Sequence, residues 1–392
     1  MSSGIARPLK AVALILAIGC TGNSTDVLEP PSDPKADIAV STVDSLYATI
    51  NDSSNSGRRV IVAPGVYMLD GSRVHGGRIE LQKDMSLIGK AGDRGAVVID
   101  AANLSATAFT DGTLLTGAVR MGRGANRVEW LTVRNATKGT AAITTDLLLD
   151  GPTTITIAHS LASNSSHGID IRNTGVTAAG RVLDVVLSDN ELADNTTGVG
   201  QGIRVANLQG ANGAFIRVMM SDTYAHGNIA GLLAANQGTS SATVVIDSRD
   251  DRFNGNGNGA VLLGGFATST LVASGNLVRF SVLSSHFEHN TAPLGTSFPA
   301  RFGVGVYGGV TTSPILASDN RAELELHSAV ISDNGGPDIA AWGAISSTMQ
   351  PAGSRNVASA VLWGTSTGAA VNVVNSAPAE SAGTNQVIVV KR

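Results

Sequence analysis

Short apolar runs recur along the chain and are separated by turns rich in glycine, asparagine and aspartate. Short runs bounded by such turns favour buried β-strands over helices. Clear examples are Val60–Val62, Val185–Leu187, Val218–Met220, Val244–Ile246 and Phe280–Val282. Further strands are predicted at Arg78–Leu81, Ser86–Gly89, Ala96–Asp100 and, at the end of the chain, Gln386–Val390. We therefore expect an all-β protein in which the apolar residues of successive strands stack into one core.

One segment near the start of this pattern has the period of a helix instead. Its apolar residues at i, i+3, i+4 and i+7 are Val43, Leu46, Tyr47 and Ile50. We predict a short amphipathic helix there, with Ser41 and Asp44 as its capping pair. Such a helix would cover the open end of a repetitive core.

An asparagine returns at intervals of 28 to 44 residues through most of the chain. The positions are Asn135, Asn164, Asn195, Asn228, Asn256, Asn290 and Asn334. A glycine follows shortly after in most copies, at Gly139, Gly168, Gly198, Gly231 and Gly259. Repetition at this period indicates a solenoid. Stacked asparagines can donate their amides from coil to coil, each bond contributing about 1 kcal/mol.

The first strand runs into the turn Pro64-Gly65 and resumes as Val66-Tyr67. Together with the helix before it and the coils after it, this opening resembles that of the pectate-lyase-like superfamily. The resemblance implies a single-stranded right-handed parallel β-helix over residues 38–392, with a short N-terminal capping helix.

The N-terminus has the composition of a targeting segment. Arg7 and Lys10 precede the apolar run Ala11–Gly19, which is too short to span a bilayer. Leu16–Cys20 resembles a bacterial lipobox, in which the cysteine becomes the lipidated N-terminus; an ordinary signal peptide is the alternative. We predict a signal peptide over 1–19 and a lipidated Cys20 with a flexible tether over 20–37. The expected location is the outer membrane or cell surface, or otherwise the periplasm or medium.

Charge and cysteine content exclude several classes of function. Only 15% of residues are charged, the formal net charge is -4, and no basic stripe is present, which argues against a nucleic-acid partner. The single cysteine excludes an intramolecular disulfide. No histidine pair at zinc-ligand spacing, nucleotide-binding glycine motif or nucleophile elbow occurs, so no metal or cofactor is expected.

The segment Asn164–Asp170 is similar to the polygalacturonase motif Asn-Thr-Asp-Gly-Ile-Asp. His167 stands where the family has its first catalytic aspartate, and the next coil offers Gly200-Gln201-Gly202 without paired aspartates. Inverting hydrolysis needs two carboxyl groups about 6.5–9.5 Å apart, and only Asp170 is suitably placed. The acidic pair at 250–251 is interpreted as a solvated turn.

Strand alternation places Asp170, Arg172 and Arg204 on an outer face, with His167 and Gln201 at its rim. A catalytic interpretation makes His167, Asp170, Arg172 and Arg204 the active residues, with Gln201 as a binding residue. In a lyase, an arginine would be the base, and carboxylates would hold calcium. The alternative is an exposed ion pair between Asp170 and Arg204 on neighbouring strands, contributing less than about 1 kcal/mol.

Three apolar-aromatic-Gly triplets near the C-terminus are centred on Tyr307, Trp342 and Trp363. If they are equivalent, these rings form a row that could bind sugar faces or a protein partner. Interior packing is the alternative.

Two classes of function remain open. The first is an exported, lipid-anchored protein that binds a polysaccharide or a cell-surface protein along its long face without a complete set of catalytic groups. The second is a polysaccharide lyase or glycoside hydrolase acting on an acidic or plant-type polysaccharide, since this fold carries many activities.

Overall fold

The computed structural model describes residues 36–104, 110–111, 114–115, 117–138, 141–145, 153–291, 301–311, 315–346, 353–367, 372–373 and 384–392. The predicted signal peptide, Cys20 and all but the last two residues of the predicted tether lie outside the described residues. The chain from Ala36 to Arg392 forms one unit of structure.

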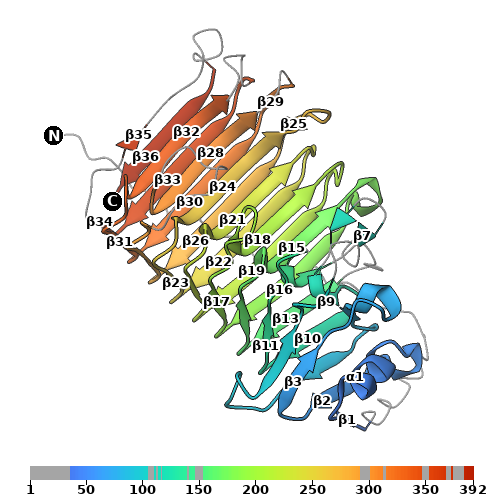
Figure 1. Cartoon of the computed structure of the whole chain (residues 1–392). Helices are drawn as coiled ribbons and strands as arrows, with labels where there is room; N and C mark the ends of the chain where they lie inside the picture. The colour runs from blue at the N-terminus through green and yellow to red at the C-terminus, as the bar shows by residue number, and fades with distance from the viewer. Residues whose placement is uncertain are drawn as a thin grey trace, which may run out of the picture. The chain divides into compact units, whose positions relative to one another are not determined.

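Three long parallel sheets, named A, B and C here, run along the length of this unit (Figure 1). Each coil of the chain contributes one strand to each sheet in the order A, B, C. Sheet A contains β1 (Ile38–Val40), β2 (Arg59–Val62), β5 (Ser86–Ile88), β10 (Ala125–Glu129), β13 (Thr153–Ala158), β16 (Val182–Ser188), β19 (Phe215–Ser221), β22 (Thr243–Arg249), β26 (Leu277–Leu283), β30 (Arg321–His327), β33 (Val357–Trp363) and β36 (Gln386–Lys391). Sheet B contains β3 (Gly65–Met68), β6 (Val97–Asp100), β11 (Thr132–Arg134), β14 (Leu161–Ser163), β17 (Glu191–Ala193), β20 (Tyr224–His226), β23 (Arg252–Phe253), β27 (His286–Glu288), β31 (Val330–Ser332) and β34 (Ser366–Thr367).

Sheet C completes each coil. Its strands are β4 (Ile79–Glu80), β9 (Gly117–Met121), β12 (Ala141–Thr145), β15 (His167–Thr174), β18 (Gln201–Leu208), β21 (Ala230–Gln237), β24 (Asn258–Ala267), β28 (Val304–Thr311), β32 (Ile339–Ser346) and β35 (Asn372–Val373). Two small pairs lie beside the coils, the parallel β25 (Ala273–Ser274) and β29 (Ala317–Ser318) and the antiparallel β7 (Thr110–Asp111) and β8 (Leu114–Leu115). Short 3-10 turns occur at Ser53–Asn55, Val74–Gly77 and Val176–Ala178. The fold is a right-handed parallel β-helix, which confirms the prediction.

The predicted helix is α1 (Val43–Ile50), at the N-terminal end of the coils (Figure 1). It packs against β1, β2 and β4, and its Leu46, Tyr47 and Ile50 are buried. The Tyr47 hydroxyl donates a hydrogen bond to the Gly77 carbonyl, which ties the helix to the first coil. The cap differs from the prediction, since Thr42 and Ser45 form the capping box.

The core follows the alternation of the sheet A strands. In β16, Val185 and Leu187 are buried whereas Val186 is only half-buried, and β19 repeats the pattern with Val218 and Met220 inside. Because successive side chains of a strand point to opposite faces, only alternate members of each apolar run enter the core. The other members form the outer face of sheet A.

The connection from sheet A to sheet B has two residues in every coil from β10 onward. The first residue of each turn has a positive φ between 47° and 56°. These residues are Trp130, His159, Asp189, Asp222, Asp250, Ser284, Ser328 and Gly364. The connections from sheet C back to sheet A differ in length from coil to coil. The connections from sheet B to sheet C also differ in length, so coil length varies at two corners and is fixed at the corner between sheets A and B.

Five of the predicted asparagines form a hydrogen-bonded row at the corner between sheets B and C: Asn195, Asn228, Asn256, Asn290 and Asn334. The Nδ2 of each of the first four donates to the Oδ1 of the next coil's asparagine, at 3.0, 2.9, 3.3 and 2.8 Å. Asn135 and Asn164 precede the row position by one residue, with φ of 65° and 47°. They stand outside the row but stack on each other as predicted, because Asn164 Nδ2 donates to Asn135 Oδ1 at 2.6 Å. Ser165 takes the row position, and its N–H donates to Asn195 Oδ1 at 3.1 Å.

A second row of asparagines, which the sequence analysis missed, lies at the corner between sheets C and A. It consists of Asn276, Asn320, Asn356 and Asn385, joined from Nδ2 to Oδ1 at 2.9, 3.1 and 3.1 Å.

A row of glycines packs against the first asparagine row, at Gly168, Gly202, Gly231, Gly259 and Gly303. A Cβ at Gly231 would lie 2.7 Å from the carbonyl oxygen of Gly259 and 3.1 Å from Asn256 Nδ2. The coils can approach this closely only without a side chain there. Of the glycines predicted to accompany the asparagines, Gly198 lies outside this row and Gly139 outside the described residues.

Candidate functional site

The predicted charged cluster lies on the outer face of sheet C, on β15 and β18. Ile169 and Ile171 lie in the core, so Asp170 and Arg172 point to the other side of the sheet. The register pairs Asp170 with Arg204 and His167 with Gln201. The structure therefore brings the predicted residues together. They are not exposed, however, and the buried members are His167, Asp170, Arg172 and Gln201.

Asp170 is held by two guanidinium groups. Arg204 Nε donates to its Oδ1 at 2.8 Å and Arg204 Nη2 to its Oδ2 at 2.5 Å, and Arg172 Nη1 lies 3.5 Å from Oδ2. Burial alone would raise the pKa of Asp170, but the charges of Arg204 and Arg172 outweigh it and hold this pKa well below its usual range. The predicted ion pair exists, but it is buried rather than exposed, because the Asp170 side chain is 0% accessible.

His167 lies beside this pair as a neutral ring. Burial lowers the pKa of His167 to about 3, and the charge of Arg204 contributes in the same direction. Its Nδ1 accepts the backbone N–H of Gln201 at 3.3 Å, which places the ring proton on Nε2. The Gln201 side chain donates to the Val199 carbonyl at 2.5 Å, and its Oε1 is buried without a hydrogen-bond partner among the described residues.

The charged row extends toward the N-terminal end of sheet C, which the sequence analysis did not anticipate. Thr144, Arg120 and Glu80 occupy the register position of Asp170 in the preceding coils. Glu80 Oε1 accepts Arg78 Nε at 2.6 Å and Arg120 Nη1 at 2.8 Å. The row is apolar in later coils, where its members include Leu233 and Val261. The charged residues of this face thus form buried pairs in the N-terminal half of the sheet.

This arrangement limits what the cluster can do chemically. A general acid must carry a proton near neutral pH, whereas Asp170 is ionised and saturated by guanidinium donors. A lyase base must be free to accept a proton, whereas Arg204 is engaged with Asp170. Within the described ranges, no group of three or more His, Cys, Asp or Glu side chains could hold a metal ion.

Tyr307 and Trp342 form a stacked pair on the same outer face of sheet C. They are register partners, with ring centroids 4.5 Å apart and planes inclined by 11°. Phe302 packs against both rings, at 6.2 and 6.1 Å. Tyr307 and Trp342 are only 3% and 8% exposed, so the pair packs in a small apolar cluster on this outer face, separate from the central core, and a ligand would have no access to the ring faces.

Trp363 does not belong to that row. It is the last residue of β33 in sheet A, where it pairs in register with His327. The His327 and Trp363 ring centroids are 5.8 Å apart and the ring planes are inclined by 7°. The Arg392 guanidinium lies over the Trp363 ring, 4.5 Å from its centroid. Trp363 is 38% exposed. The predicted three-ring row is therefore wrong, and Trp363 remains the accessible predicted aromatic residue.

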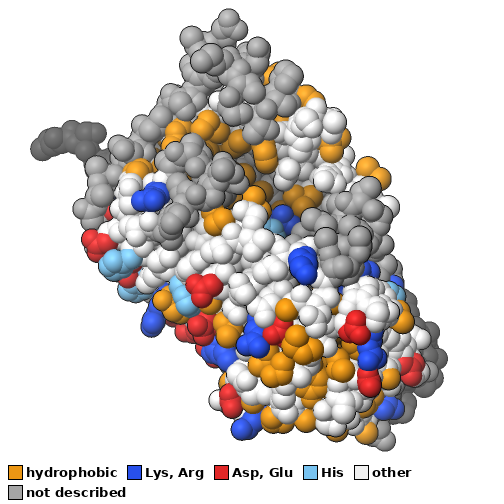
Figure 2. Space-filling model, viewed as in Figure 1, with side chains coloured by type: hydrophobic (Ala, Val, Ile, Leu, Met, Phe, Trp, Pro, Cys, Tyr) orange, Lys and Arg blue, Asp and Glu red, His pale blue; other side chains and the backbone are white. Residues whose placement is uncertain are grey.

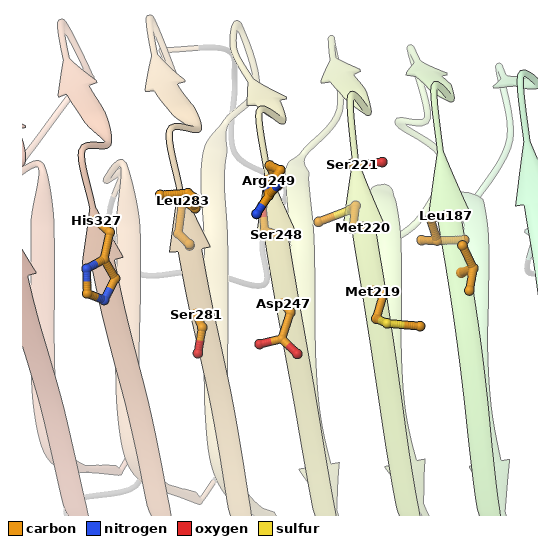
Figure 3. A pocket seen from close by; sticks show the side chains of 12 residues that line it. Leu187, Met219, Met220, Ser221, Asp247, Ser248, Arg249, Ser281, Leu283 and His327 are labelled. Atoms are coloured by element: carbon orange, nitrogen blue, oxygen red, sulfur yellow. The ribbon is translucent and has the colours of Figure 1, made fainter.

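A groove of about 480 Å³ crosses the outer face of sheet A close to this ring pair. Figure 3 shows side chains from β16, β19, β22, β26 and β30 around it. The lining residues are Val186, Leu187, Met219, Met220, Ser221, Asp247, Ser248, Arg249, Ser281, Val282, Leu283 and His327. Since neighbouring strands are about 4.8 Å apart, five strands extend over about 19 Å. The lining combines outward residues, such as Met219 and Asp247, with buried residues at the ends of the same strands, such as Met220, so no sequence motif marks the groove.

Two unpaired charges stand in the middle of the groove, Asp247 and Arg249 on β22 (Figure 3). Both are exposed, and in the part of the chain that the structure describes neither side chain forms an ion pair or hydrogen bond. Other arginines of this face are paired, for example Arg217 with Asp184 at 2.9 Å and Arg279 with Glu323 at 2.8 Å. The groove thus combines the hydrogen-bond donors of the Arg249 guanidinium, the acceptors of the Asp247 carboxylate and an apolar surface.

On the face shown in Figure 2, the described acidic and basic side chains are interspersed, and neither sign forms an extended patch. None of the described helices has the length and hydrophobicity needed to cross a membrane.

No protein-family model matches the sequence, and no curated protein matches it. Several solved structures are similar. The Azotobacter vinelandii mannuronan C-5 epimerase AlgE4 A-module is 14% identical, with 87% of this chain and 96% of that chain covered and a TM-score of 0.38. The pectate lyase Pel9A is 14% identical, with coverage of 85% and 72% and a TM-score of 0.41. The Agl-KA catalytic domain is 12% identical, with coverage of 92% and 69% and a TM-score of 0.41.

Proposed function

We propose that this protein is an exported, lipid-anchored β-helix protein that binds an extended glycan across sheet A without cleaving it. The observation that carries the proposal is the groove over five neighbouring coils, with Asp247 and Arg249 unpaired at its centre. A binding site of this kind combines apolar surface with a few polar groups that fix orientation. The groove meets that description.

The chemistry of the lining suits a sugar chain. Ser221 and Ser281 are hydroxyl donors and acceptors, Asp247 is an acceptor and Arg249 is a donor, so both kinds of partner for sugar hydroxyls are present. The exposed side chains of Met219 and of the residues around it offer apolar surface to the C–H faces of the rings. A groove that runs across the strands accommodates a linear polymer.

The stacked rings extend this surface at one end. His327 lines the groove, and Trp363 lies directly behind it in the next coil. The exposed edge of Trp363 and the Arg392 guanidinium on its face offer a further contact for a polymer that runs past His327. In this proposal Trp363 retains its predicted role in binding, whereas Tyr307 and Trp342 stabilise the coils.

Binding is preferred to catalysis because of the state of Asp170. This carboxylate, the one expected to act in sugar cleavage, is buried and neutralised by Arg204 and Arg172. Such a triad is expected of a structural ion-pair network. The lyase or hydrolase alternative requires the network to open.

The test is a glycan array with the mature protein, followed by calorimetric titration of the glycans retained. We expect Arg249→Ala and Asp247→Ala each to weaken binding on the order of tenfold, because each removes a charge-assisted hydrogen bond. Arg217→Ala is the matched control, since its ion pair with Asp184 lies on the same face outside the groove lining. Equal affinities for all three variants would place the ligand elsewhere.

A parallel assay for new reducing ends and unsaturated products decides between binding and cleavage. We expect no product from any glycan that is retained. Turnover that disappears in both His167→Ala and Arg204→Ala would establish the enzymatic alternative. Tryptophan fluorescence adds a local readout, because a ligand near Trp363 should change the emission of the parent protein but not that of Trp363→Phe.

The anchor is tested separately at Cys20. We expect metabolic labelling with a radioactive fatty acid to modify the parent protein and not Cys20→Ser, and the variant to leave the membrane fraction. Labelling of both proteins, or of neither, would contradict lipidation at this residue.

A further inference from the structure

The corner between sheets A and B carries a second stacked row directly behind the positive-φ residues. Its members in consecutive coils are Ser160, Asn190, Thr223, Asp251 and Ser285. Asn190 shows what the position requires: its Oδ1 accepts the Ser160 N–H at 3.1 Å, and its Nδ2 donates to the Ile157 carbonyl at 2.8 Å. A neutral side chain with hydrogen-bonding capacity satisfies the backbone of the corner. Asp251 is the member of this row with a carboxyl group, whereas the other four have uncharged side chains.

Asp251 is fully buried, contrary to the solvated turn predicted for it. Its Oδ1 accepts the Thr223 N–H at 2.7 Å, and its Oδ2 lies 2.5 Å from Ser248 Oγ. Ser285 Oγ accepts the Asp251 N–H at 3.1 Å and lies 3.2 Å from Ser248 Oγ. Asp251 therefore joins the turns of three consecutive coils, through its carboxyl group to Thr223 and through its backbone N–H to Ser285.

No cation balances this carboxyl group in the described part of the molecule. Burial raises the pKa of Asp251 to about 7, although the hydrogen bonds from Ser248 and Thr223 act in the opposite direction. The charge of Asp222, in the preceding turn, raises it further. The titratable and charged groups on the elements around Asp251 are Asp222 in the preceding coil, Asp247, Arg249, Asp250 and Arg252 in its own coil, and His286 and Glu288 in the next coil, whose turn contributes the uncharged Ser284 and Ser285.

The same network reaches the groove. Ser248 and Arg249 line the groove on β22, and both immediately precede the turn that Asp251 closes. The wall of the groove and the buried carboxyl group are thus one hydrogen-bonded unit.

We propose that Asp251 holds a proton in the folded protein and acts as a pH-sensitive latch, whose ionisation loosens the corner and the groove wall formed by Ser248 and Arg249. The ionised form places a negative charge in a site without a counterion, next to a row built for neutral groups. Water can solvate it only if the Thr223, Asp251 and Ser285 turns separate. This inference concerns the groove itself and stands whether or not a glycan binds there.

The direction of the effect follows from linkage. The folded protein binds this proton more tightly than the unfolded chain, whose reference value is 3.8. Stability from this group is complete below about pH 4 and is lost progressively as the pH rises toward 7. The latch itself opens around pH 7, where the folded protein gives up the proton.

Infrared difference spectroscopy of the full chain reads the proton directly. We expect the stretch of a protonated carboxyl group to disappear between pH 6 and pH 8 in the parent protein, at a midpoint of about 7, and to be absent at both pH values in Asp251→Asn. Asparagine is the conservative replacement, because Asn190 fills the equivalent position. Asp250→Asn, in the exposed residue beside it, is the control and should titrate as the parent does. A parent spectrum without a protonated carboxyl group at pH 6 would overturn the proposal.

Amide hydrogen exchange measures how far the corner opens. At pH 8 the amides of Thr223 and Asp251 should exchange about tenfold faster in the parent than the amides at these positions in Asp251→Asn, and at equal rates at pH 5.5. Equal rates at both pH values would show that ionisation leaves the corner closed. If Asp251→Asn fails to fold, the parent protein alone still tests the proposal. As the pH rises, the protection of the Thr223 amide from exchange must fall relative to that of the Asn195 amide, which lies at another corner.

Discussion

Replacing Asn228 with alanine tests the principle that stacked amides hold the coils together. Asn228 Oδ1 accepts both the backbone N–H and the Nδ2 of Asn195, each at 3.0 Å. Its Nδ2 donates to the Leu192 carbonyl and to Asn256 Oδ1, each at 2.9 Å. All of these atoms are buried, so water cannot replace the missing side chain.

The magnitude follows from the groups left behind. The Asn195 N–H loses its acceptor inside the protein, which costs about 1–3 kcal/mol, and the two bonds donated by Asn228 add about 1 kcal/mol. We therefore expect the free energy of unfolding to fall by about 2–4 kcal/mol. That is a large part of the usual stability of a folded domain.

Urea unfolding gives the global effect, and hydrogen exchange at the Asn195 amide gives the local one, which matters because repeat arrays can open coil by coil. Asn164→Gly is the matched control. Asn164 is exposed, outside the row and at a φ of 47°, which glycine adopts readily. The hydrogen bond from its Nδ2 to Asn135 Oδ1 is exposed, so water can replace it. We expect this control to change stability by less than about 0.5 kcal/mol. A loss below about 1 kcal/mol in Asn228→Ala, with unchanged exchange, would refute the reasoning.

Three further changes probe other parts of the molecule. Gly231→Ala should lower the free energy of unfolding, measured by thermal unfolding, by about 1–3 kcal/mol, because its Cβ would lie 2.7 Å from a carbonyl oxygen of the next coil. Gly95→Ala is the control and should leave stability unchanged, because its Cβ would have an ordinary contact at 3.5 Å. Asp170→Asn should lower the free energy of urea unfolding by about 3–5 kcal/mol by leaving the buried Arg172 and the largely buried Arg204 without their shared counterion. In the parent, the stability from this carboxylate is present above the unfolded value of 3.8 and is lost as the pH falls below it, so acid unfolding should reveal it and Asp170→Asn should lack this step. Tyr307→Phe should leave the melting temperature unchanged or raise it, since the buried hydroxyl has no hydrogen-bond partner among the described residues.

Spacing and alternation were sufficient to predict the fold. The strands at 86–89 and 386–390, the helix at 43–50 and the stacking of asparagines were all readable, because each follows from a local period. Which residue of each coil occupies the stacked position could not be predicted from the sequence. Asn164 and Asn195 both precede a glycine, yet the first is a positive-φ turn residue and the second is a buried member of the row. Coils of unequal length leave a one-residue ambiguity that only the register resolves.

The site was harder to predict for the same reason. Tyr307 and Trp363 sit in similar apolar-aromatic-Gly triplets, but Gly308 continues a strand of sheet C whereas Gly364 turns the corner out of sheet A. Local sequence does not say which sheet a strand joins. Burial is a second limit: strand alternation gives the side on which Asp170 lies, but it gives no information on whether that side is open to water.

The two-residue corner between sheets A and B has a consequence for engineering. One extra residue there would exchange inward and outward positions in the following strand, whereas the connections from sheet C to sheet A already differ in length between neighbouring coils. Foreign peptides grafted into those connections, for instance between Gly210 and Gly213, would emerge as loops while the coils beneath keep their alignment. A series of such insertions would turn the molecule into a molecular ruler, on which displayed epitopes are spaced by multiples of about 4.8 Å.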